Sequence, residues 1–260
     1  MRNRAYSSLA AALLAAVCVG PRAAAQRGGP PGPPPTPRAS APFDISGQWV
    51  AVVSEDWRYR MTLPPKGDYG GIPLNPNGRR TADAWDPARD EAAGEQCRAY
   101  GVAALMRMPT RVRISWIDDQ SLKIESDAGT QTRTIVFGAP RGQGGDWQGL
   151  SVASWDRSAP AVGGGFFPGG GARGGSLKVV TTKMKSGYLR RNGVPYSGDA
   201  VMTEYFDRFD VPGVPGGDSL LVVSTELVDP TYLAQPYWTS SHFRKQTDTS
   251  GWSPTPCVAR

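Results

Sequence analysis

The sequence predicts a mainly β protein, in which an antiparallel meander of about eight to ten strands closes into a barrel. Between residues 43 and 260, most of the chain alternates apolar and polar residues with a period of two. These segments are rich in Val, Ile, Thr and aromatic residues, which favour strands, and short turns at 118–120 and 127–129 separate some of them. A long meander hides its edge strands most simply by closing.

Each expected strand is one run of this alternation. In chain order the runs are residues 47–54, 57–63, 111–117, 121–126, 130–137, 147–155, 177–184, 200–209, 219–228 and 237–245. A short helical insertion is expected at 75–109, where Ala, Glu, Arg and Leu are frequent. Pro87 begins or divides a helix there and Pro109 ends one, so we expect two short helices that form an insertion or a lid.

The N-terminus has the three parts of a Sec signal peptide. Arg2 and Arg4 precede a short run of small and apolar residues, and an A-x-A site ends at Ala25. We therefore expect cleavage of residues 1–25, a secreted or periplasmic location and no transmembrane segment in the mature chain. Cys18 leaves a lipid anchor open as an alternative, although a valine precedes it where lipidation requires a small residue.

Cleavage also lowers the formal net charge from +6 to +3, because three arginines and no acidic residue lie in residues 1–25. The remaining basic residues are scattered among acids, whereas nucleic-acid-binding domains concentrate Lys and Arg on one face. A nucleic-acid partner is therefore excluded. Residues 26–42 are rich in Pro and Gly with almost nothing apolar, which predicts a disordered linker. Residues 43–260 then form a single barrel domain.

Residues 159–176 form a glycine-rich loop within this domain. Glycine runs bind phosphate where they lead from a strand into a helix, but this run leads into an expected strand. A hairpin tip is the favoured interpretation. Phe166 and Phe167 at its centre are candidates for contact with a membrane or a ligand.

Two cysteines, Cys97 and Cys257, are left after cleavage, and in an oxidising compartment an even pair predicts a disulfide. The alternative is two free thiols or a metal pair, but the chain has no C-x-x-C spacing and one histidine. Carboxylates gather between Asp86 and Glu95, without the spacing of a calcium loop, and such clusters are usually a solvated helix face. We expect neither a metal site nor a cofactor.

The segment "FDISGQWVAV" resembles the first strand of lipocalin-type (calycin) barrels, with Trp49 as the tryptophan of their G-x-W motif. In that family the tryptophan packs at the closed end of the barrel beneath an arginine of the last strand. The resemblance therefore assigns structural roles to Trp49 and Arg244. The chain is longer than a lipocalin and shows no helix after the last strand. Segments such as "DEAAGEQCRAYG" and "LRRNGVPYS" also resemble a group of uncharacterised secreted bacterial proteins, which implies no activity.

Carboxylates on apolar strands are the candidates for chemistry. His242 is the only histidine, so a histidine-based zinc site or a Ser-His-Asp triad is nearly excluded. Glu204, Asp207 and Glu226 each share a strand face with apolar residues, and burial in a cavity would raise the pKa of a carboxyl enough for acid–base catalysis. A buried ion pair, for example with Arg133 or Arg208, is the favoured alternative, since an unpaired buried charge is very costly.

Three functions remain open. The first is binding of a small, largely apolar molecule in an aromatic-lined barrel. The second is an isomerase or hydrolase that uses barrel carboxylates on a hydrophobic substrate, and the third is a non-catalytic structural or interaction protein of the cell envelope. The expected ligand-binding side chains are Glu204, Tyr205, Trp116, Trp147, Arg133 and His242.

Overall fold

The computed structural model describes residues 32–156, 175–210 and 219–259. Pro35–Arg260 form one compact unit, which contains every strand of the described part of the chain. The expected signal peptide and nearly all of the expected glycine-rich loop, with Phe166 and Phe167, lie outside the described residues.

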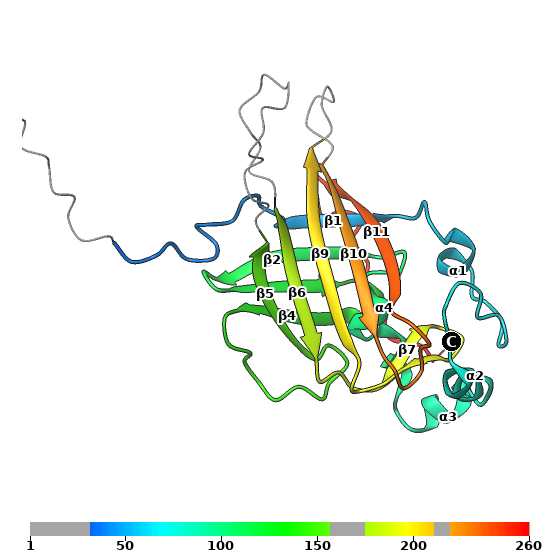
Figure 1. Ribbon diagram of the computed structural model, residues 1–260. Helices are drawn as coiled ribbons and strands as arrows, with labels where there is room; N and C mark the ends of the chain where they lie inside the picture. Colours follow the sequence, from blue (N-terminus) through cyan, green and yellow to red (C-terminus); the bar gives the residue numbers. More distant parts are fainter. Residues whose placement is uncertain (1–31, 157–174, 211–218, 260) are drawn as a thin grey trace, which may run out of the picture. The chain divides into compact units, whose positions relative to one another are not determined.

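Nine strands form a closed barrel (Figure 1). They are β1 (Gly47–Val52), β2 (Arg111–Asp118), β3 (Ser121–Ser126), β4 (Gln131–Phe137), β5 (Leu150–Asp156), β6 (Ser176–Thr182), β9 (Val201–Asp210), β10 (Ser219–Val228) and β11 (Tyr237–Gln246). Their order around the barrel is β1-β11-β10-β9-β6-β5-β4-β3-β2, and β1 pairs with both β11 and β2 to close it. The predicted mainly β barrel is confirmed.

One pairing departs from an antiparallel meander. Strands β4 and β5 are parallel, with Ile135 opposite Ser151. The link between them returns the chain to the end where β4 began, and it contains several glycines with positive φ, including Gly138 and Gly149. A second departure is a separate two-stranded sheet, β7 (Gly187–Arg190) and β8 (Val194–Tyr196), inserted between β6 and β9.

The expected strand at 57–63 is wrong. This segment contains a one-turn helix, α1 (Trp57–Met61), which has no buried residue. Asp56 before it adopts a left-handed conformation with φ 50° and turns the chain away from the barrel. Because β1 already pairs on both sides, the closed barrel leaves no edge on which this segment could continue as a strand.

The helical insertion is present as four short segments rather than two. They are α2 (Pro76–Asp83), α3 (Pro87–Ala92), the 3₁₀ helix η1 (Gln96–Tyr100) and α4 (Val102–Leu105). Each of the first two begins with a proline after a capping side chain, as Asn75 and Asp86 accept hydrogen bonds from backbone N–H groups of the first turn. Met106 follows α4 and packs into the barrel core, so this segment covers one end of the barrel.

The barrel interior is packed with inward-facing side chains, of which Trp49, Phe206 and Phe243 are fully buried. The indole N–H of Trp49 donates to the carbonyl oxygen of Ile45 at 2.8 Å. The cation over its ring is Lys245, whose Nζ lies 5.6 Å from the ring centroid.

The structural role expected for Arg244 is therefore wrong. Alternation along β11 turns Phe243 inward and places Arg244 on the exposed outer face. Lys245, one residue later, occupies the position over Trp49 that the lipocalin resemblance assigned to an arginine.

The chain before β1 packs against the barrel, which corrects the expectation of a disordered linker up to residue 42. The indole N–H of Trp155 donates to the carbonyl oxygen of Pro37 at 2.8 Å. The backbone N–H of Arg38 donates to the carbonyl oxygen of Asp119 at 3.1 Å. The described part of this segment therefore forms hydrogen bonds with the barrel, which its Pro- and Gly-rich composition does not predict.

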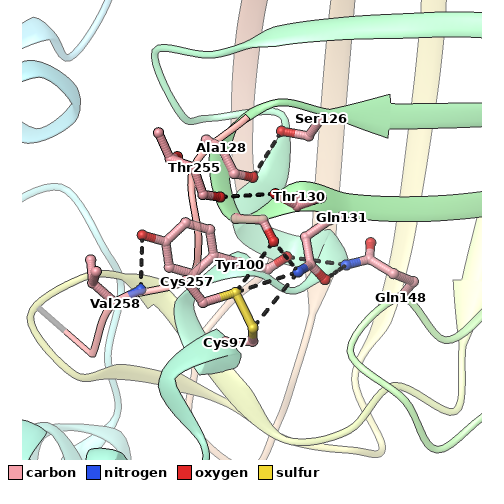
Figure 2. Close-up of a disulfide and its surroundings, with 11 residues drawn as sticks. Cys97, Tyr100, Ser126, Ala128, Thr130, Gln131, Gln148, Thr255, Cys257 and Val258 are labelled. Carbon is pink, nitrogen blue, oxygen red and sulfur yellow. Dashed lines mark hydrogen bonds between the residues drawn. A yellow bond between two sulfur atoms is a disulfide. The ribbon is translucent and has the colours of Figure 1, made fainter. Parts of the chain in front are cut away.

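The predicted disulfide between Cys97 and Cys257 is confirmed (Figure 2). It joins the chain after β11 to η1 across a sequence separation of 160 residues. The same C-terminal segment is held by the N–H of Thr255, which donates to the carbonyl oxygen of Asp127 at 2.8 Å. The C-terminal segment is therefore fixed to the helical insertion and to the β3–β4 turn.

Candidate functional site

A cavity of about 290 Å³ lies at the end of the barrel that α4 covers, and we call it the end pocket. Four parts of the chain form most of its wall: residues 59–64 in and after α1, residues 99–109 around α4, residues 189–191 at the end of β7, and the inward side chains Thr225, Leu227, Tyr237 and Thr239 of β10 and β11. Strand register brings the last group together, since Thr225 is opposite Thr239 and Leu227 is opposite Tyr237.

The wall of the end pocket combines apolar and polar side chains. Met61, Leu63, Met108, Leu189 and Leu227 contribute the larger aliphatic side chains. Met61 and Leu63 are 56% and 53% exposed, so the side formed by the chain after α1 faces solvent. A small cavity that combines apolar surface with polar groups is typical of a site for a small organic molecule.

Among the described residues, arginines supply all the formal charge on this wall. Arg60, Arg107, Arg190 and Arg191 line the end pocket, and no Asp or Glu among the described residues does. The Arg60 side chain is only 3% exposed; its Nη1 contacts Glu55 Oε1 at 2.5 Å and its Nε donates to the carbonyl oxygen of Arg107 at 2.7 Å.

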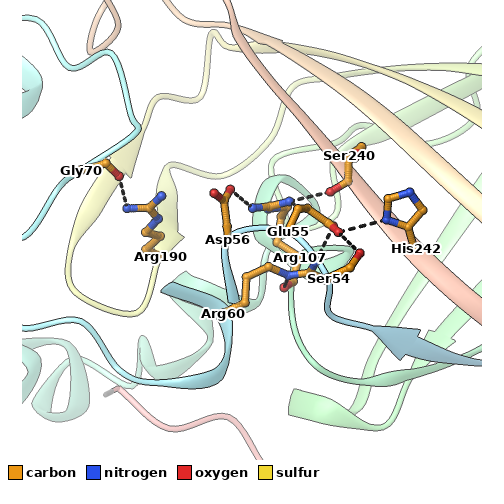
Figure 3. Close-up of polar contacts among 9 residues, drawn as sticks. All are labelled: Ser54, Glu55, Asp56, Arg60, Gly70, Arg107, Arg190, Ser240 and His242. Atoms are coloured by element: carbon orange, nitrogen blue, oxygen red, sulfur yellow. Dashed lines mark hydrogen bonds and ion pairs between the residues drawn. The ribbon is translucent and has the colours of Figure 1, made fainter. Parts of the chain in front are cut away.

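Arg107 connects the segment after α4 to strand β11 and to the residue before α1. Its Nη1 donates to the carbonyl oxygen of Ser240 on β11 at 2.6 Å, and its Nη2 contacts Asp56 Oδ2 at 2.5 Å (Figure 3). Glu55 also lies near, 3.8 Å from Arg107 Nη1. The carboxylates of Glu55 and Asp56 therefore offset the charges of Arg60 and Arg107 from behind the wall.

Glu55 is the centre of this polar cluster. It accepts a hydrogen bond from the Ser54 hydroxyl at 2.7 Å, and its Oε2 lies 3.0 Å from His242 Nδ1 (Figure 3). Burial raises the pKa of Glu55, but the hydrogen bonds from Ser54 and His242 and the charge of Arg60 outweigh it and hold the pKa below its ordinary value. Glu55 is therefore an ionised anchor rather than a proton donor at neutral pH.

Arg190, at the end of β7, has a different environment. Its Nη1 donates to the carbonyl oxygen of Gly70 at 2.7 Å, and its guanidinium lies 4.2 Å from the ring centroid of Tyr59. Among the described residues it forms no ion pair with a carboxylate. It is a cation positioned by a carbonyl and an aromatic ring.

Glu204 lies inside the barrel and does not line the end pocket, although it is directly opposite Thr225, which does. It forms an ion pair with Arg133, in which Nη2 and Oε2 are 2.5 Å apart and both side chains are 1% exposed. Arg133 also donates to the hydroxyls of Ser151 and Thr181 at 2.9 and 2.8 Å. The structure therefore has the buried ion pair of Glu204 with Arg133 that the sequence favoured over a catalytic carboxylate.

Asp207, Glu226 and Tyr205 lie on the outer face of the barrel wall, because they alternate with the buried residues of β9 and β10. Asp207 accepts a hydrogen bond from the hydroxyl of Ser176, and Lys178 Nζ lies 5.7 Å from the ring centroid of Tyr205. The three candidate carboxylates are thus divided between the two faces of the wall and form no common site.

The remaining candidates are also apart from the end pocket. Trp116 stacks on Phe137 at 5.8 Å, and Trp147 precedes β5 with Lys185 Nζ 4.3 Å from its ring centroid. His242 is on the outer face of β11 and contacts Glu55.

Arg60, Arg107 and Arg190 were not among the site residues expected from the sequence. The available signal was the recurrence of arginine in "WRYRM", "LMRMP" and "LRRNG", three segments distant in sequence that the fold brings to one pocket.

Two further observations bear on what the described residues can do. No group of three or more His, Cys, Asp or Glu side chains in the described part lies close enough together to hold a metal ion. No helix within the described ranges is long and apolar enough to span a bilayer.

Comparison with known proteins found no relative of this chain. The chain matches no family model, no curated protein and no solved structure, so its fold class rests on the strand pairing described above.

Proposed function

We propose that this protein binds a small, largely apolar molecule in the end pocket. The observation that carries the proposal is a cavity of about 290 Å³ whose wall combines aliphatic side chains with arginines and hydroxyl groups. The site differs from the one expected from sequence, because the barrel interior holds packed side chains such as Trp49, Phe206 and Phe243. The ligand site is therefore at the end of the barrel.

A secreted or periplasmic location is part of this proposal. The Cys97–Cys257 disulfide supports it, because disulfides persist mainly in oxidising compartments. The signal-peptide pattern of residues 1–25 points in the same direction.

Filling the end pocket tests the proposal. Ala103 lines the pocket, whereas Ala92 is exposed at the end of α3. We expect Ala103→Phe to abolish binding of an apolar fluorescent probe, N-phenyl-1-naphthylamine, and Ala92→Phe to leave it unchanged. Native mass spectrometry of protein purified from its own compartment is expected to show a bound small molecule in the wild type only. Equal probe binding by both variants would refute the end pocket as the site.

An enzyme that uses Glu204 with Asp207 or Glu226 has no supporting observation. Catalysis by paired carboxylates requires both groups to reach one substrate, and these three lie on opposite faces of the barrel wall.

A non-catalytic envelope-interaction protein is favoured by one feature, an exposed apolar surface at α1. Trp57, Met61 and Leu63 are 62%, 56% and 53% exposed, and exposed apolar clusters often mark contact sites. Co-sedimentation with the cell-envelope fraction is expected to fall in a Trp57→Ser/Met61→Ser variant. Trp238→Ser removes a tryptophan that is equally exposed, at 58%, and serves as the control.

A further inference from the structure

We propose that the ligand of the end pocket is an amphipathic anion, with its negative group bound by Arg190 and its apolar part against the aliphatic wall. This inference rests on the proposed function, because it names the chemical class of the molecule that the same pocket binds.

The first observation is the sign of the charge on the wall. Four arginines and, among the described residues, no carboxylate line the end pocket. Glu55 and Asp56 pair with Arg60 and Arg107 from outside the lining. Arg190 has no carboxylate partner among the described residues, so its charge attracts a ligand of the opposite sign.

The second observation is the set of contacts that Arg190 makes. A guanidinium has five N–H donors in a planar fork, and Arg190 uses one nitrogen, Nη1, to donate to the Gly70 carbonyl oxygen. Its guanidinium carbon also lies over the Tyr59 ring, 4.2 Å from the ring centroid, and this contact restrains the group. An arginine held in this way keeps an edge with Nε and Nη2 for a planar, bidentate contact with an oxyanion.

The third observation concerns Arg60, which is buried beside Arg107. One of its nitrogens, Nη2, is buried with no hydrogen-bond partner among the described residues. Burial and the charge of Arg107 lower the pKa of Arg60, and Glu55 and Asp56 offset this only in part. Repulsion between Arg60 and Arg107 is one part of this lowering, and a bound anion would reduce it.

The aliphatic wall excludes a small inorganic anion as the preferred ligand. Met61, Leu63, Met108, Leu189 and Leu227 offer apolar surface that an ion such as phosphate cannot cover. The ligand class that satisfies both parts of the pocket is an aliphatic chain or ring with one acidic group, either a carboxylate or a phosphate ester.

Matched ligands test the inference by isothermal titration calorimetry at neutral pH. Decanoate, decyl phosphate and decan-1-ol share one chain and differ in the head group, and acetate supplies a head group without a chain. We expect the two anions to bind at least about tenfold more tightly than the alcohol, as for a charged hydrogen bond, and acetate to give no measurable binding. The anion that binds more tightly shows whether the acidic group of the ligand is a carboxylate or a phosphate ester.

Substitution of Arg190 tests the assignment of the head-group site. Arg190→Gln is expected to reduce the affinity for the anions about tenfold and to leave the affinity for decan-1-ol unchanged, while Arg190→Lys retains part of the preference. Arg141→Gln is the control, because Arg141 is 58% exposed and pairs with Asp118 at the opposite end of β2. Circular dichroism of each variant checks that the barrel has folded.

The outcomes separate this inference from the proposed function. If the alcohol and the anions bind the wild type equally and Ala103→Phe abolishes both, the apolar site stands and the anionic ligand class is overturned. If Arg190→Gln keeps the full preference for anions, Arg190 is not the head-group residue. If Ala103→Phe changes the binding of no probe, the proposed function and the inference both fail.

Discussion

Arg133 of β4 and Glu204 of β9 form an ion pair inside the barrel, and both side chains are 1% exposed. Only part of their hydrogen-bonding capacity is used, since Arg133 Nη1 and Glu204 Oε1 have no partner among the described residues. A buried pair of this kind is costly to break because the remaining charge stays buried.

Removal of one partner is therefore expected to destabilise the protein strongly. Glu204→Gln should lower the free energy of unfolding by about 3–5 kcal/mol, measured by urea denaturation. The double variant Arg133→Met/Glu204→Leu removes both charges and is expected to recover most of the loss. A double variant as unstable as the single one would show that the charges themselves hold the barrel together.

Acid is expected to destabilise the cluster around Glu55. Its folded-state pKa lies below the ordinary value of 4.5, so its contribution to stability is complete above that pH and is lost as the pH falls through the lower folded value. Glu55→Gln should therefore make the free energy of unfolding less dependent on pH in this acidic range. Glu91→Gln on the exposed surface of α3 is the control, and its pH dependence should match the wild type.

Loss of the disulfide is expected to destabilise the protein because it raises the conformational entropy of the unfolded chain. Cys97 and Cys257 are 160 residues apart, and removing a crosslink over so long a loop costs about 2–5 kcal/mol. A Cys97→Ser/Cys257→Ser variant should unfold at a lower urea concentration than the oxidised wild type. The reduced wild type should unfold at about the same concentration as the variant, and a large difference between them would point to a packing effect of the substitutions.

Substitution of Lys245 is expected to destabilise the protein, whereas substitution of its neighbour Arg244 is not. Lys245→Met removes the cation over Trp49 and should lower the free energy of unfolding by about 0.5–1 kcal/mol, with a change in tryptophan fluorescence. Arg244→Ala on the outer face should stay within about 0.5 kcal/mol of the wild type and leave the fluorescence unchanged. A larger loss of stability in Arg244→Ala than in Lys245→Met would support the structural role that the lipocalin resemblance gave to Arg244.

The strands with long alternation could be predicted closely from the sequence. Residues 219–228 were expected as a strand and β10 has these bounds, while the strand expected at 200–209 is β9, shifted by one residue. Alternation of apolar and polar residues makes such strands predictable, because the apolar face must be buried. The segment "WRYRM" alternates in the same way but forms α1, because a closed barrel offers it no partner strand.

The candidate site could not be predicted in the same way. The arginines of the end pocket come from α1, from the residues after α4 and from β7, and only the folded insertion brings these together. Periodicity reports which face of one element is buried. It carries no information on which distant segments share a cavity, and for this reason Arg60 and Arg190 were not among the expected residues.

Barrel closure through β1 also sets the order in which the molecule can be completed during folding. Strand β1, first in the chain, has its second partner in β11, which ends at Gln246. Until β11 is available, β1 and β10 each keep an unpaired edge able to pair with another chain. A chain truncated before β11 should therefore aggregate rather than form a smaller barrel.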